Sequence, residues 1–250
     1  MTINSSSDLA GLTRVGALVA NALRAMERET RPGLTTGQLD GVGEAYLRRH
    51  GARSAPQMSY GFPGFCCISV NDEIVHGVPG SRVLKPGDVV KIDVTAELDG
   101  FVADAAITVV LPPVSAEARR LRKCAQRAFA RAMGVASAGR PIREIGRVVE
   151  DEVVRHNFAV VREMCGHGVG RAIHEHPSVP NYYSMLTRGT LTEGMVLAVE
   201  PIISAQPARV VEDPDGWTLR THNRCLAAHY EHTVVIRSGE PLVLTMATGG

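Results

Sequence analysis

Residues Lys91–Val110 read KIDVTAELDGFVADAAITVV, two runs rich in β-branched residues on either side of an Asp-Gly pair. Asp-Gly favours the two-residue turn that joins antiparallel strands, so the stretch predicts a β-hairpin. With that turn, Thr95 pairs with Asp104, and Asp93 lies diagonally from Asp104 on the same face of the sheet. The hairpin therefore brings two carboxylates together.

Acids in a hairpin are usually solvated, but these two have apolar neighbours on both strands. Such neighbours leave little water, and two close carboxylates repel each other unless a cation lies between them. Glu200 ends one apolar run and Glu231 precedes another, so an ionised form of either also needs a partner. Four such carboxylates with a histidine predict an oxygen-rich site with room for two divalent ions.

Helix and strand patterns occur in the same order twice along the chain. The first half, about residues 1–112, predicts helices from Asp8 to Arg31 and from Thr36 to Gly51, then strands between Cys67 and Leu111. The second half, about residues 113–250, predicts helices at 116–133 and 141–156, then strands at 158–164, 195–204, 219–222 and 230–238. We therefore expect an α+β fold with pseudo-symmetric halves and a site in the cleft where their sheets meet.

The bulk composition excludes several classes of protein. The chain has 250 residues, 44% of them apolar, and a formal net charge of +1, so no overall field points to nucleic acid, an acidic membrane or an acidic substrate. No apolar run approaches the length of a membrane span, and Arg14 interrupts the stretch closest to a signal peptide. Five cysteines without CxxC spacing suit reduced thiols, which predicts a cytoplasmic protein without membrane contact.

A second stretch, CGHGVGRAIHEHP (Cys165–Pro177), holds three histidines and three glycines. It is not followed by the helix and acid that a dinucleotide-binding loop requires, and its last two histidines are too close together for an HExxH zinc motif. Glycines on both sides of His167 allow the backbone to bend so that the imidazole reaches into a site.

Five blocks follow one another along the chain: NDEIVHGVPG (Asn71–Gly80), KIDVTAELDGFVADAA (Lys91–Ala106), CGHGVGRAIHEHP (Cys165–Pro177), MVLAVEPII (Met195–Ile203) and AAHYEHTVVI (Ala227–Ile236). In this order they resemble type I methionine aminopeptidases, over roughly residues 8–245. The resemblance implies the pseudo-two-fold pita-bread fold, with antiparallel sheets enclosing a central metal cleft and helices outside. It also implies a single catalytic domain over residues 1–250.

The resemblance further implies the chemistry. A water that bridges two divalent ions (Co, Mn, Fe or Zn) would attack the scissile carbonyl. The metal ligands would be Asp93, Asp104, His167, Glu200 and Glu231. Glu200 would pass the proton of the water to the leaving amine, His174 would hydrogen-bond the developing oxyanion, and His76 would orient the scissile nitrogen.

By the same resemblance, the pocket for the methionine side chain is formed by Phe62, Cys67 and Trp217, with His76 at its edge. Core packing is the alternative for the two aromatic residues. Ile173 and Ser59 stand where the family often has aromatic residues, so we expect weaker discrimination between methionine and similar side chains. We expect His176 at the surface and a structural role for His232.

The resulting expectation is an aminopeptidase that removes the N-terminal methionine from nascent proteins and peptides with a small second residue. The alternatives are an aminopeptidase of the same fold with shifted selectivity for the N-terminal residue, and a noncatalytic ribosome-binding relative. Four basic residues on one stripe of the helix at 116–133 offer either a solvated face or a surface for ribosomal RNA: Arg120, Lys123, Arg127 and Arg131.

Overall fold

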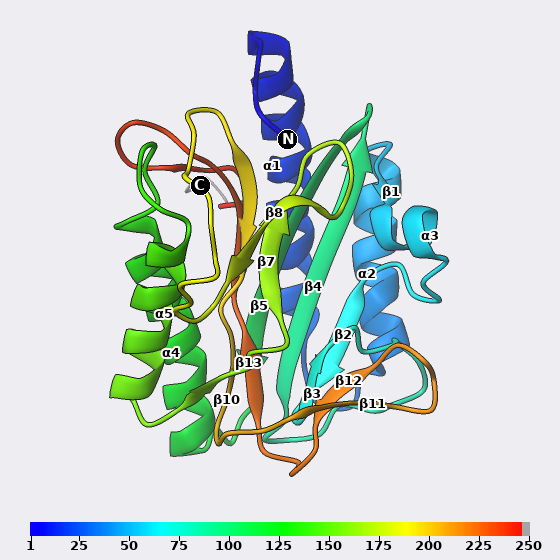
Figure 1. Cartoon of the computed structure of the whole chain (residues 1–250). Coiled ribbons are helices and arrows are strands. Elements are labelled where there is room, and N and C mark those ends of the chain that lie inside the picture. Colours follow the sequence, from blue (N-terminus) through cyan, green and yellow to red (C-terminus); the bar gives the residue numbers. More distant parts are fainter. Residues whose placement is uncertain (247–250) are drawn as a thin grey trace.

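The computed structural model describes residues 1–246 (Figure 1). Its helices are α1 (Ser6–Glu29), α2 (Thr36–Arg49), α3 (Ala55–Tyr60), α4 (Ala116–Met133) and α5 (Arg143–Arg155). The strands before α4 are β1 (Arg53–Ser54), β2 (Cys67–Val70), β3 (Glu73–Val75), β4 (Val89–Leu98) and β5 (Phe101–Val110). Those after α5 are β6 (Ala159–Val160), β7 (Cys165–Gly168), β8 (Glu175–Pro180), β9 (Val196–Val199), β10 (Ile202–Ser204), β11 (Val210–Glu212), β12 (Leu219–Thr221), β13 (Ala227–His229), β14 (Glu231–Val235) and β15 (Leu242–Val243). This mixture confirms the predicted α+β class.

A nine-stranded sheet carries strands from both ends of the chain. Its main order is β1-β4-β5-β14-β9-β7-β8, with β2 also paired to β4 and β15 to β14. The remaining strands form two three-stranded sheets, with the orders β13-β10-β6 and β11-β12-β3. The first half of the chain meets the second where β5 pairs with β14, and there Glu231 stands opposite Ala106. Acids that are far apart in the sequence thus become neighbours on one sheet.

The hairpin of β4 and β5 has the predicted register. Leu98 stands opposite Phe101, and Thr95 stands opposite Asp104. The turn residues Asp99 and Gly100 have φ angles of 53° and 79°, and positive values at both positions are what the tight turn compatible with strand twist requires.

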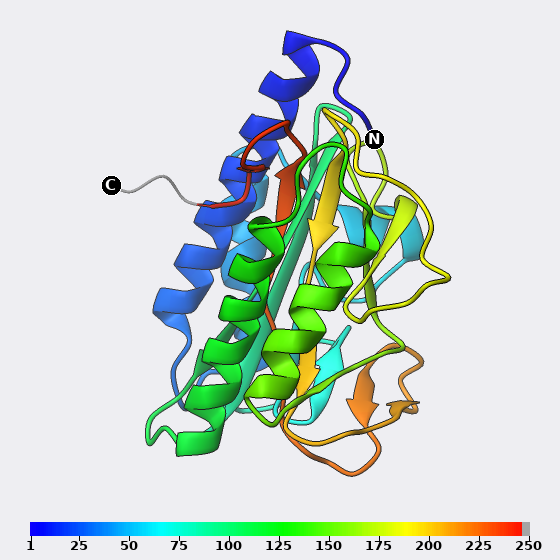
Figure 2. The same ribbon diagram turned by 60° about the vertical axis from the view of Figure 1, so that its left-hand side comes forward.

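Helices cover one side of the strands and leave the other side for the site. In Figure 1, α1 lies behind β4 and β5, and in Figure 2 α4 and α5 stand in front with α1 to their left. One buried cluster joins α1 and α2 to β4 and β5, and a second joins α4 and α5 to the strands of the second half. The start of α1 differs from the predicted start at Asp8: Ser5 is the N-cap and accepts from the Asp8 amide, so Asp8 lies in the first turn.

The predicted strand at 195–204 is two strands in the structure. The chain leaves the large sheet after β9 and joins a different sheet as β10, and Glu200-Pro201 lies at the break. Pro201 has no amide hydrogen to donate to a neighbouring strand, which is consistent with an interruption of the strand at this point. The short helix α3 was not predicted; Ser54 caps it by accepting from the Gln57 amide. Across residues 1–246, no helix combines the length and the apolar character that crossing a membrane demands.

Candidate metal centre and substrate pocket

A cavity of about 520 Å³ lies beside β4, β5 and β14, and residues from both halves of the chain line it. Eleven of the twelve predicted site residues line this cavity: Phe62, Cys67, His76, Asp93, Asp104, His167, Ile173, His174, Glu200, Trp217 and Glu231. Ser59 is exposed and is not among the lining residues, whereas its neighbour Tyr60 is.

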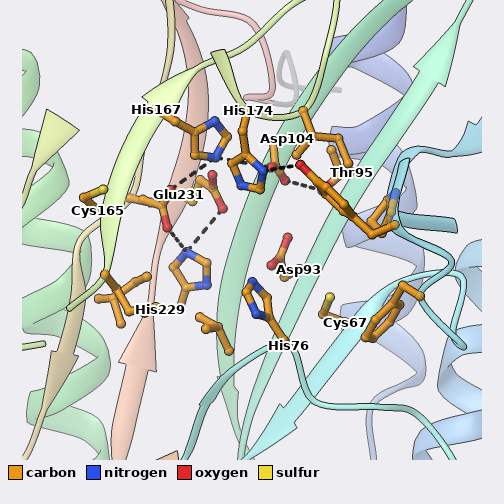
Figure 3. Close-up of a pocket in the computed structure, with 18 of the residues that line it drawn as sticks. Cys67, His76, Asp93, Thr95, Asp104, Cys165, His167, His174, His229 and Glu231 are labelled. Carbon is orange, nitrogen blue, oxygen red and sulfur yellow. Dashed lines mark hydrogen bonds and ion pairs between the residues drawn. The ribbon is translucent and has the colours of Figure 1, made fainter. Parts of the chain in front are cut away.

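Four carboxylates meet at the floor of the cavity. Asp93 and Asp104 come from the hairpin, Glu231 begins β14, and Glu200 follows β9 (Figure 3 labels the first three). Burial raises the pKa of Asp104 to about 6 and raises the pKa values of Asp93, Glu200 and Glu231 well above their ordinary range. Within residues 1–246, the basic side chains within 4.0 Å of these carboxylates are those of His167 and His229, and no lysine or arginine is among them.

The donor atoms of this floor form two groups that share Glu231. Asp93, His229 and Glu231 form one, and Asp104, His167 and Glu231 form the other, with the chosen donor atoms of each group within 4.8 Å of one another. Oδ1 of Asp93 is buried and has no hydrogen-bond partner in the described chain. Carboxylate oxygens and imidazole nitrogens suit divalent ions, so these residues fit a metal centre.

The sequence analysis did not single out His229. Its side chain is 2% exposed, and burial lowers its pKa to about 3, so the imidazole is neutral at physiological pH. The available signal was its position two residues before Glu231, which puts both side chains on one face of an extended chain.

His167 has the tautomer that a metal ligand needs. Its Nδ1 donates to the Gly168 carbonyl oxygen at 3.0 Å, because a carbonyl can only accept. The lone pair therefore lies on Nε2, which is 3.4 Å from Oε1 of Glu200 and 4.0 Å from Oδ2 of Asp104.

The glycines beside His167 serve close strand packing. A Cβ added at Gly166 would lie 2.4 Å from the Ala198 carbonyl oxygen, and one added at Gly168 would lie 2.3 Å from the His176 carbonyl oxygen. The expected reason was a sharp backbone bend. The actual constraint is that the neighbouring backbones approach too closely for any side chain.

His174 stands at the rim with a partner that sequence analysis missed. Its Nδ1 lies 2.6 Å from the Tyr60 hydroxyl, and its ring centroid is 4.3 Å from that of His167. If Tyr60 donates this hydrogen bond, the proton of the neutral imidazole is on Nε2, which can then donate to a substrate oxygen. Figure 3 shows His174 and His76 pointing toward the space around the acids.

The sequence of this chain is similar over nearly its whole length to those of known metallopeptidases. The model of metallopeptidase family M24 matches residues 10–238. The chain belongs to this family. It is 42% identical to methionine aminopeptidase 2 of Bacillus subtilis over 247 residues, which are 98% of this chain and 99% of that one.

Solved structures agree with this family assignment. A methionine aminopeptidase from Thermotoga maritima superposes with a TM-score of 0.95 at 32% identity, over 98% of this chain and 100% of the other. The predicted pita-bread fold is thereby confirmed. A prolidase from Pyrococcus furiosus, 20% identical with a TM-score of 0.81, matches 99% of this chain but only 66% of its own, and this likeness concerns the fold alone. Membership of family M24 also implies divalent metal binding.

The apolar wall of this M24 cavity lies beside the acids. Phe62 meets Trp217 edge to face, with ring centroids 5.3 Å apart. Cys67 and Ile173 are buried in the same wall, and burial raises the pKa of the Cys67 thiol well above its ordinary value. The wall is therefore apolar and uncharged.

The two histidines expected outside the site differ from each other. His232 is buried away from the cavity, with Nδ1 2.9 Å from the Thr245 hydroxyl and Nε2 3.1 Å from that of Tyr230, which agrees with a structural role. His176 is exposed as expected, but it also lines the outer part of the cavity.

Proposed function

We propose that this chain removes the N-terminal methionine from polypeptides and peptides whose second residue is small. This proposal rests above all on one observation. Four carboxylates and two imidazoles form a buried cluster at the end of an apolar pocket that is lined by sulfur-containing and aromatic side chains. Support comes from the family and from relatives named methionine aminopeptidases at 34–42% identity over nearly their whole length.

The proposed metal ligands are Asp93, Asp104, His167, Glu200 and Glu231, and the metals are two divalent ions drawn from Mn, Fe, Co and Zn. When bound, such ions would supply an activated water and polarise the scissile carbonyl. Glu200, whose carboxylate is buried among the other acids, is the proposed acceptor of the water's proton, which it would pass to the leaving amine.

The proposed roles of His174 and His76 rest on their positions at the cavity. His174 donates through Nε2 to the developing oxyanion, with Tyr60 holding its other nitrogen. His76 orients the scissile nitrogen; it follows β3 with a φ angle of 57°, a left-handed conformation that is uncommon for a residue with a side chain.

The methionine side chain is proposed to lie against Phe62, Cys67 and Trp217, with Ile173 on the wall. Sulfur against an aromatic ring contributes about 0.3–1.5 kcal/mol, which favours methionine over a branched aliphatic residue. Tyr60 at the rim supplies an aromatic ring beside Ser59, so the absence of an aromatic residue at Ser59 itself does not leave the rim without one.

We also propose that residues 1–250 act as one catalytic domain in the cytoplasm. Two features support a single unit: acids of both halves line the same cavity, and β5 of the first half is hydrogen-bonded to β14 of the second. Nascent polypeptides are then the substrates.

The direct test is turnover of three peptides by the chelated and then Mn-, Fe- or Co-reconstituted protein. We expect Met-Ala-Ser to be cleaved, Leu-Ala-Ser to be cleaved far more slowly, and Met-Lys-Ser to resist because its second residue is large. Preferred cleavage of Leu-Ala-Ser would instead favour the same-fold aminopeptidase with shifted selectivity. No cleavage of any peptide would favour the noncatalytic alternative.

Docking on the ribosome through α4 is a separate part of this proposal. Arg120, Lys123, Arg127 and Arg131 are all exposed, which suits contact with phosphates. Arg120 and Arg127 also contact His156, so part of the stripe serves the packing of α4 against α5. A salt-dependent ribosome pelleting assay tests the docking: the double variant Arg127→Glu, Arg131→Glu should pellet less, and unchanged pelleting would contradict it.

A further inference from the structure

His229 is a buried imidazole that the proposed reaction does not use. Both of its ring nitrogens are buried, and neither has a hydrogen-bond partner in the described chain. An unpartnered imidazole in the interior is unfavourable, because each polar atom has lost water without a replacement. Such a group in a native fold calls for a partner that the polypeptide itself does not supply.

The backbone holds His229 firmly in this position. Its amide donates to the Thr108 hydroxyl at 3.0 Å, and that hydroxyl donates back to the His229 carbonyl at 2.8 Å. His229 also pairs with Ile202 at the end of β13. Figure 3 shows its ring pointing toward the acids of the cavity floor. The ring is thus aimed at the site by its own strand.

The distances around Nε2 of His229 match those within a metal's ligand shell. Nε2 lies 3.2 Å from Oε2 of Glu231 and 3.7 Å from Oε2 of Glu200. Donor atoms that share one ion at bond lengths of about 2.0–2.2 Å lie roughly 3.0–3.5 Å apart. The separation from Glu231 falls in that range, and a donor atom of Asp93 completes the group within 4.8 Å.

We propose that His229 is a nitrogen ligand of the ion held by Asp93 and Glu231. This inference rests on the proposed two-ion site and adds a sixth protein ligand to it. Each ion then has one imidazole, His167 on the Asp104 side and His229 on the Asp93 side. A nitrogen donor favours Co, Fe and Zn over Mn and Mg at the Asp93 side, because an all-oxygen site suits the harder ions.

X-ray absorption at the zinc edge tests this on the wild-type chain loaded with two zinc ions. Two histidines over two ions give about one imidazole per zinc, whereas His167 alone gives about one half. Two bound ions with half an imidazole per zinc would overturn the role of His229 alone. Fewer than two bound ions would overturn the two-ion site, and this inference with it.

Calorimetric zinc titration of His229→Gln gives a second readout. Glutamine can still hydrogen-bond Glu231 but lacks the imidazole nitrogen, so we expect affinity for the more weakly bound ion to fall at least about tenfold. The matched control is His176→Gln, a histidine of the same cavity that should retain both ions. Unchanged affinity for both ions in a folded His229→Gln would show that His229 only orients Glu231.

Discussion

Two clusters of acids lie in this molecule, and they are neutralised in opposite ways. The metal-ligand cluster, named for its proposed role, consists of Asp93, Asp104, Glu200 and Glu231. The arginine cluster consists of Asp72, Glu73, Asp213, Arg220 and Arg224, beside β3 and β12. In the arginine cluster, Arg220 pairs with Asp213, its Nη1 lies 3.0 Å from Oδ2 of Asp72, and Nη1 of Arg224 lies 3.0 Å from the same oxygen.

The two clusters differ in the pKa values of their acids. Burial raises the pKa of Asp72, but hydrogen bonds from Arg224 and Arg220 outweigh it and lower that pKa below its ordinary value. Burial raises the pKa of Asp104 to about 6, and no arginine opposes it. Where acids serve the fold, the chain provides its own fixed cations. Around the acids proposed as metal ligands it provides none, which leaves the place of the cation to a metal.

The largest expected effect is the loss of kcat when a glutamate of the metal-ligand cluster is replaced by glutamine. The same exchange in the arginine cluster provides the comparison. Glu200→Gln should lower kcat by about 10² or more, since both proton transfer and metal charge balance suffer. Glu73→Gln removes a buried charge paired with Arg82 at 3.0 Å, and it should lower stability while kcat changes by less than about threefold. Peptide turnover at matched metal content measures both. Equal losses of kcat in the two variants would erase the proposed difference between the clusters.

Metal should stabilise the fold by relieving the repulsion in the metal-ligand cluster. At a free metal concentration of 100 times Kd, the expected gain is about 2.7 kcal/mol, or about 5–11 °C in Tm for a chain of this size. Thermal unfolding of the chelated and the Mn-loaded protein measures it. Glu231→Gln is the control and should lose most of the gain, because Glu231 belongs to both donor groups. A Tm independent of saturating metal would argue against the site.

The sequence predicted much of the metal-ligand cluster because its signals are local. The Asp-Gly turn fixed the register that aligns Thr95 with Asp104, and apolar neighbours marked Glu200 and Glu231 as unusual. Two features depended on tertiary contacts and could not be predicted in this way. The approach of His229 to Glu200 depends on the sheet change after β9, which brings β10 beside β13, and the Tyr60–His174 contact joins residues 114 positions apart.

A smaller effect on kcat is expected at the contact between Tyr60 and His174. It tests whether a neutral partner, and not an arginine, orients the imidazole that is proposed to bind the oxyanion. Tyr60→Phe removes the hydroxyl at Nδ1 of His174, and a neutral hydrogen bond contributes about 0.5–1.5 kcal/mol. We expect kcat to fall about 2- to 13-fold with KM nearly constant. Ser59→Ala is the matched control at the exposed neighbour and should behave like the wild type. A Tyr60→Phe variant with unchanged kcat would remove Tyr60 from the reaction.

The smallest effect is expected at the edge of the arginine cluster. The side chain of Arg224 is 65% exposed, so Arg224→Gln should cost only a few tenths of a kcal/mol at pH 7. Because the folded pKa of Asp72 lies below its unfolded value of 3.8, the pair stabilises the fold above that pH and the contribution is lost as pH falls through the folded pKa.

The stability gap between wild type and Arg224→Gln should therefore close on acidification, and it should also shrink in high salt. Urea unfolding midpoints at pH 7 and at about pH 3 measure the gap, with chelator present so that the metal-ligand cluster does not contribute a metal-dependent term. Arg209→Gln, at an exposed arginine outside the cluster, is the control and should show no such closure. A gap that widens as pH falls would mean that Arg224 stabilises the fold by packing and not through the charge of Asp72.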